Sequence, residues 1–113
     1  MSKKDVTSLI ERLEKFEQRA GVRLEALSAF AESDDDGEFT VTVRGEAHSI
    51  KGDNLSHDVS VVVSLFDKAG RVVGTTSEYL DSDNFFGFET IDAYVELSGT
   101  SLAKIRIVPK VSD

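Results

Sequence analysis

The residues with the clearest capacity for chemistry form one acidic turn. Three aspartates at positions 34–36 precede Gly37, and such runs supply oxygen ligands to calcium. An EF-hand loop aligned on Gly37 also places Glu32 at an early ligand position, but its closing position falls on Val43, which cannot bind a cation. Since aspartate and glycine also favour turns, a solvated turn is the plainer interpretation.

Other candidate metal ligands are sparse. Asp81 and Asp83, from a second acidic turn, would complete a looser calcium site if both turns meet at one end of the fold. His48 and His57 could face each other across a hairpin, but a transition-metal site needs a third ligand and the chain has no cysteine. No nucleophile-elbow sequence and no glycine-rich phosphate loop are present. We therefore predict no cofactor, no metal site and no enzymatic activity.

An aromatic cluster offers binding rather than catalysis. Phe85, Phe86 and Phe88 follow the second acidic turn and could form a ledge for a ligand. If this segment is an alternating strand, at least one of the three faces the core, where phenylalanine is usually found. Core packing is the preferred interpretation, and the ligand ledge is the alternative.

The chain is acidic and has the size of a single domain. Its 113 residues carry a formal charge of −8, from 13 basic and 21 acidic side chains. This charge opposes binding of a polyanion, and the basic residues are scattered, so we do not expect nucleic-acid binding. No apolar run approaches the ~20 residues that cross a membrane, and no apolar signal core follows the first residues. We expect a cytoplasmic protein without a membrane span.

The amino-terminal segment 5–20 has the period of an amphipathic helix, and Gly21 follows it where a left-handed residue often ends a helix. Apolar residues recur at spacings of three and four: Val6, Leu9, Leu13, Phe16 and Ala20. A helix of this length is marginal alone, so it packs either on its own sandwich, which we favour, or on a protein partner, including a second copy. The candidate partner-binding residues are Val6, Leu9, Leu13 and Phe16.

After this helix the period changes to two, which predicts short strands separated by polar turns. The clearest strands cover residues 39–43 and 59–66, and the last covers 102–108. We predict an all-β fold, an immunoglobulin-like antiparallel sandwich of about six to seven strands over residues 22–111. Together with the helix it forms one domain, residues 1–113.

Three segments carry a family resemblance: Val43-Arg-Gly45-Glu-Ala47, Val61-Val-Val-Ser-Leu65-Phe66-Asp67 and Gly70-Arg-Val72-Val73-Gly74-Thr75. With them, residues 38–109 resemble the FxLYD family of small immunoglobulin-like domains. Val63 stands where that family has its first aromatic residue, and Phe66 replaces its tyrosine, so any hydrogen bond from that hydroxyl is lost. The water-stress domains of late-embryogenesis-abundant proteins share this pattern. The resemblance implies a sandwich fold without assigned chemistry.

Two functions remain open from the sequence. The first is a non-enzymatic interaction or accessory domain that binds a protein, indicated by the apolar helix stripe and the lack of a catalytic constellation. The second is a stress-protective or calcium-dependent ligand-binding module, indicated by the acidic turns.

Overall fold

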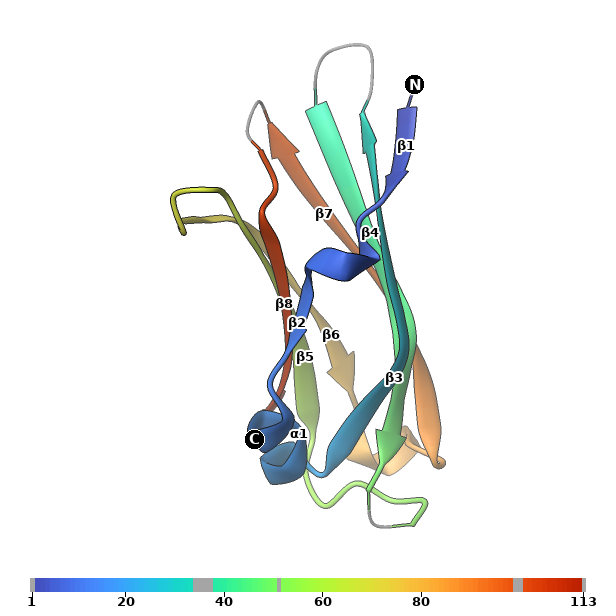
Figure 1. Cartoon of the computed structure of the whole chain (residues 1–113). Helices are drawn as coiled ribbons and strands as arrows, with labels where there is room; N and C mark the ends of the chain where they lie inside the picture. Colours follow the sequence, from blue (N-terminus) through green and yellow to red (C-terminus); the bar gives the residue numbers. More distant parts are fainter. Residues whose placement is uncertain (1, 34–37, 51, 99–100, 113) are drawn as a thin grey trace.

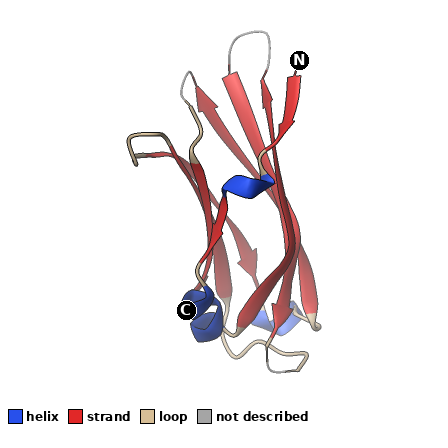
Figure 2. Cartoon of the chain, in the orientation of Figure 1, coloured by secondary structure: helices blue, strands red, loops and turns tan. Residues whose placement is uncertain are grey.

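The computed structural model describes residues 2–33, 38–50, 52–98 and 101–112, which form two packed four-stranded sheets (Figures 1 and 2). Sheet A has the order β1-β3-β4-β7 and contains β1 (Ser2–Asp5), β3 (Val22–Ser33), β4 (Glu38–Ser49) and β7 (Phe88–Ser98). Sheet B has the order β2-β8-β5-β6 and contains β2 (Ile10–Arg12), β8 (Lys104–Val111), β5 (Val59–Phe66) and β6 (Val72–Leu80). The predicted all-β sandwich is confirmed, with eight strands in the described part of the chain.

The core lies between the sheets and follows the strand period of two. In β5, every second residue from Val59 to Leu65 is fully buried, whereas the residues between them are partly exposed. The same alternation in β4 and β7 buries Val43 and Ile91. One face of each sheet therefore points into the core, and the outer face can be covered by another element of the chain or can bind a partner.

The predicted helix over residues 5–20 is wrong in its first half. The segment instead forms β1 on sheet A, a single 3₁₀ turn η1 (Thr7–Leu9), and β2 on sheet B, so the sandwich begins at Ser2 rather than at residue 22. The backbone of β1 pairs with β3, that of β2 pairs in parallel with β8, and the Val6 N–H donates to the Ala29 carbonyl at 2.9 Å. Because β3 and β8 offer backbone hydrogen bonds to this segment, pairing as strands is more stable than a short helix, which is marginal alone.

Only the second half of that segment is helical, in α1 (Glu14–Ala20). Gly21 ends it with a φ of 75°, which confirms the predicted left-handed cap. The Glu17 carboxylate, 3% exposed, accepts from Arg12 Nη2 at 2.7 Å and Nε at 3.1 Å, and from the Leu24 N–H at 3.1 Å. One buried carboxylate thus ties α1 to β2 and β3, and the hydrogen bonding that Arg12 donates to it raises the pKa of Arg12.

The sheets approach closely where β6 and β7, an edge strand of each sheet, run past one another. A Cβ added at Gly74 would lie 2.7 Å from Val95 Cγ1, so this crossing requires glycine. In β4, Gly45 lies opposite a register shift between Glu25 and Ser28, where the Leu27 side chain fills the space that a Cβ would occupy. These glycines allow close backbone approach rather than unusual dihedral angles.

Candidate functional site

The four amino-terminal residues predicted to bind a partner do not share one helix face. Val6 and Leu9 line a cavity whose strand residues all belong to sheet A, at the end of the sandwich where the amino terminus lies (Figure 1). Leu13 and Phe16 line a groove on the outer face of sheet B. Because the amino-terminal segment passes from sheet A to sheet B, it divides the four predicted residues between two separate candidate sites. We call these sites the end cavity and the outer groove.

The outer groove lies between α1 and the outward side chains of β5, β6 and β8, with a volume of about 330 Å³. Its floor is apolar: Leu13, Phe16, Val62, Phe66, Val72 and Val108. Arg106 and Lys110 stand at its border. Phe16 and Val72 are 37% and 58% exposed, so part of this apolar surface meets water in the described structure.

The electrostatics of the outer groove are dominated by cations. Arg106 Cζ lies 4.8 Å from the centre of the Phe66 ring, and Lys104 Nζ lies 5.8 Å from it. Glu11 accepts from Arg106 Nε at 2.6 Å and pairs with Lys104 at 3.5 Å, and the hydrogen bond from Arg106 lowers the pKa of Glu11. Lys110 forms no ion pair with any described residue. Three cations thus face one carboxylate.

The outer face of sheet A has the opposite character. Its outward carboxylates outnumber its cations, and they include Glu25, Glu32, Glu46, Asp92 and Glu96. Arg44 pairs with Asp92 at 3.3 Å, and His48 contacts Glu25 and Glu46 at 3.2 and 3.0 Å. This face has no helix over it in Figure 1.

The three phenylalanines predicted as core or as a ledge take different positions. Phe85 is buried at 2% exposure, whereas Phe86 and Phe88 are 80% and 52% exposed. The Phe88 ring stacks on His48 with ring centres 5.3 Å apart. Core packing is therefore right for Phe85 alone, and the other two lie at the edge of the acidic sheet A face.

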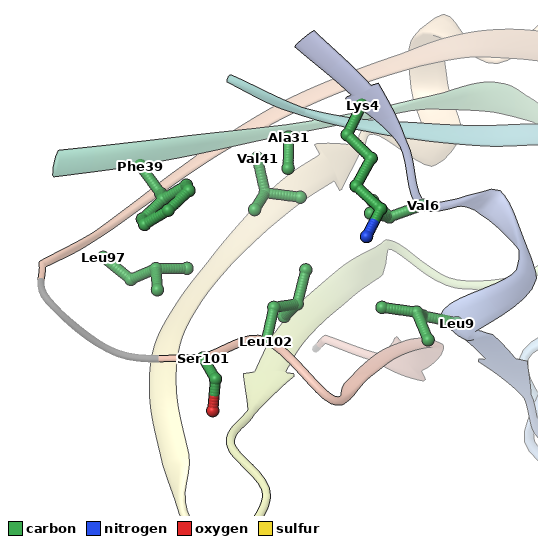
Figure 3. A pocket seen from close by; sticks show the side chains of 9 residues that line it. All are labelled: Lys4, Val6, Leu9, Ala31, Phe39, Val41, Leu97, Ser101 and Leu102. Carbon is green, nitrogen blue, oxygen red and sulfur yellow. The ribbon is translucent and has the colours of Figure 1, made fainter. Parts of the chain in front are cut away.

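The end cavity is the more enclosed of the two candidate sites, with a volume of about 180 Å³ (Figure 3). Its wall is formed mostly by apolar side chains of sheet A, of the η1 connection and of the segment before β8: Val6, Leu9, Ala31, Phe39, Val41, Leu97 and Leu102. Lys4 is the one cationic residue among the lining residues, and Ser101 lies at the border. Figure 3 shows the Lys4 side chain directed from β1 into the space between these walls.

Only some of the candidate metal ligands lie in the described part of the chain. The acidic turn at residues 34–37 lies outside the described ranges. Asp81 and Asp83 follow the end of β6, where Asp81 caps the short turn η2 (Ser82–Asn84). Among the described residues, no three His, Asp or Glu side chains are grouped to hold a metal ion.

Two further aspartates have structural partners. Asp67 is buried in the β5–β6 turn and accepts from the Ala69 N–H, the Arg71 N–H and Arg71 Nε, and the Arg71 backbone bond is the main reason that its pKa is lowered. Asp58 accepts from Ser82 and Tyr79, which lowers the pKa of Asp58 and raises that of Tyr79 to about 12. These hydrogen bonds hold turns, and they assemble no catalytic pair.

Comparison with known proteins adds little to this geometry. No protein-family model matches the sequence, and no curated protein matches it. One solved structure is similar, a β-glucuronidase from glycoside hydrolase family 2, with a TM-score of 0.49 and 12% sequence identity. The match covers 83% of this chain and 11% of that chain, so this chain spans a small part of that protein's length. The resemblance to the FxLYD family stays a prediction.

None of the helices in the described part of the chain is long and apolar enough to cross a bilayer.

Proposed function

We propose that this protein is a non-catalytic interaction domain that binds an apolar, acidic segment of a partner protein in the outer groove. The observation that carries the proposal is the pairing of exposed apolar side chains with a cationic border, in a chain whose formal charge is −8. Leu13 and Phe16, two of the residues predicted to bind a partner, line this groove.

The apolar floor supplies the larger part of the binding free energy. The apolar surface of the groove includes Phe16 of α1 together with Val62, Phe66 and Val72 of sheet B. Apolar patches with polar borders mark interaction sites, and burial of each Å² contributes roughly 25 cal/mol before the entropic costs of association. A partner segment with two or three large apolar side chains would fill this floor.

The cations select for acidic residues beside those apolar side chains. Arg106 and Lys104 are held over the Phe66 ring, so their position is fixed before a partner arrives. Complementary charges steer association and exclude wrong partners more than they add affinity. A short segment with a few carboxylates fits this border, whereas a long polyanion or a second copy of the chain is repelled by the net charge.

A peptide selection tests the proposal with a defined probe. A displayed library of random 12-residue peptides is selected on the whole chain, and the winners are measured against the double variant Val72→Ser/Lys110→Glu. We expect winners rich in Asp or Glu together with Leu, Phe or Trp, whose affinity falls about tenfold or more on that variant. Both substituted residues are exposed, so the fold is retained.

The matched control places the same kinds of change on sheet A, in Tyr94→Ser/Arg44→Glu. Tyr94 is 72% exposed, and Arg44 is an exposed residue of the same sheet face. The selected peptides should bind this control within about twofold of the unchanged chain. Winners without acidic residues, winners unaffected by the groove variant, or a selection that yields no binder would each overturn the proposal.

The alternative function, a stress-protective or calcium-dependent module, has its own measurement. Calcium that binds only the folded chain raises the midpoint of thermal unfolding as its concentration rises. A midpoint that stays constant from zero to 10 mM calcium would remove the calcium version, and a steady rise would place it above the interaction domain.

A further inference from the structure

We infer that the end cavity is a binding site for a small apolar monocarboxylate, with Lys4 as the group that receives the carboxylate. This inference goes beyond the proposed function, because the cavity is lined mainly by sheet A and shares no lining residue with the outer groove. Binding at one site can therefore be confirmed or excluded without deciding whether the other site binds a ligand.

The size and wall of the cavity define the body of the ligand. Its volume is about 180 Å³, and an apolar cavity of roughly 150 Å³ accommodates benzene. Most of the wall is contributed by β1, β3, β4 and β7, which are the four hydrogen-bonded strands of sheet A. Val6 and Leu9 at η1 and Leu102 before β8 complete it, so the wall is held mainly by one sheet rather than by a single loop. A single aromatic ring or a branched chain of comparable size fits this space.

Lys4 defines the polar end of the ligand. In β1, Lys4 pairs with Ala31 of β3 and shares its inward face, and Figure 3 shows the Lys4 side chain directed toward the cavity. No carboxylate is among the described residues that line the cavity, and Lys4 forms no ion pair with a described residue. An ammonium group beside an apolar wall attracts a ligand that combines a carboxylate with an apolar body.

An inward-pointing lysine on an edge strand can also serve to prevent association between chains, and the test must distinguish this role from ligand binding. Lys4 lies on an edge strand of sheet A, and charges that point inward from an edge discourage pairing with another chain. In that case the replacement of Lys4 would promote association between copies and would leave ligand binding unchanged.

The test compares phenylacetate with its neutral analogue phenylacetamide, each titrated into the whole chain and followed by amide NMR shifts. We expect phenylacetate to shift the amides of Val6, Leu9 and Leu102 at millimolar concentration, and to bind about fivefold more tightly than the amide, a modest preference because Lys4 is exposed. Lys4→Gln should remove this preference. Lys3→Gln, on the same strand but over the Phe30 ring, is the matched control and should preserve it.

A cavity-filling variant tests the location. Ala31→Leu places extra volume in the wall and should abolish binding of both compounds, and circular dichroism reports whether the variant folds. If it does not fold, the comparison of Lys4→Gln with Lys3→Gln still decides the inference. Absence of shifts at 20 mM phenylacetate, or equal binding of acid and amide with no effect of Lys4→Gln, would overturn it.

Discussion

The outer faces of the two sheets carry similar ingredients in opposite proportions. Both show outward aromatic side chains beside charged ones: Phe88 and Tyr94 on sheet A are exposed, and Phe66 on sheet B is half-buried. On sheet A the aromatics stand among carboxylates, and on sheet B they stand beneath cations and against α1. The formal charge of −8 belongs to the whole chain and does not give the local charge of either sheet face. An acidic chain can therefore still bind an acidic partner through the cationic face of sheet B.

The largest expected effect comes from removing the Glu17 carboxylate, which ties α1 to β2 of sheet B and to β3 of sheet A. Glu17→Ala leaves the Leu24 N–H without its acceptor and Arg12 without its partner, so the free energy of unfolding should fall by about 3 kcal/mol. Urea unfolding measures the change. Glu25→Ala, at an exposed carboxylate of sheet A, should cost at most about 0.5 kcal/mol, and equal losses in both variants would show that the two faces do not differ in this way.

The next effect concerns the crossing where the two sheets meet. Gly74→Ala brings a Cβ to 2.7 Å from Val95 Cγ1, a stiff β-branched side chain in the core, so β6 or β7 must shift. We expect a loss of about 2 kcal/mol, measured as a lower denaturation midpoint with an unchanged dependence on urea. Gly70→Ala is a control without steric contact, since its cost arises from the φ of 82° alone. A neutral Gly74→Ala would contradict the close approach.

The strand β5 and the amino-terminal segment show where sequence patterns predict structure correctly and where they do not. The alternation of Val59, Val61, Val63 and Leu65 predicted a strand and its buried face, because period two has one structural solution for a half-buried strand. The spacing of Val6 and Leu9 has two solutions, since a helix and a single 3₁₀ turn both place residues three apart on one side. Long-range pairing with β3 and β8 decided between them, and no local pattern encodes that pairing.

The candidate sites were predictable only in part for the same reason. The apolar residues Leu13 and Phe16 were found from the sequence, but the cations beside them come from β8, about ninety residues later in the chain. The alternation of Lys104, Arg106 and Lys110 around buried isoleucines was a visible signal for one charged face. Their place beside α1 depends on the parallel pairing of β2 with β8, which a sequence pattern does not report.

A smaller effect is confined to acid pH and concerns the turn next to the outer groove. The hydrogen bonds of Asp67 lower its folded pKa, so its stabilising contribution is present above its unfolded pKa, near 4, and is lost as the pH falls through the folded value. Asp67→Asn should therefore be less stable than the unchanged chain at pH 7, and should lose less stability between pH 5 and pH 2. Unfolding curves across this range give both slopes, and parallel slopes would contradict the assignment.

The smallest effect isolates the charge difference between the faces. Lys110→Glu and Arg44→Glu change the net charge equally, so any difference between them reports local surroundings rather than overall repulsion. Arg44→Glu places a carboxylate opposite Asp92, on an already acidic face, and should destabilise by a few tenths of a kcal/mol. Lys110→Glu places a carboxylate near the cations of sheet B and should be neutral or slightly stabilising. At 1 M salt, where charges are screened within about 3 Å, this difference should vanish. Identical shifts at low salt would mean that the two faces do not differ in potential, and the case for an acidic partner on sheet B would fail with them.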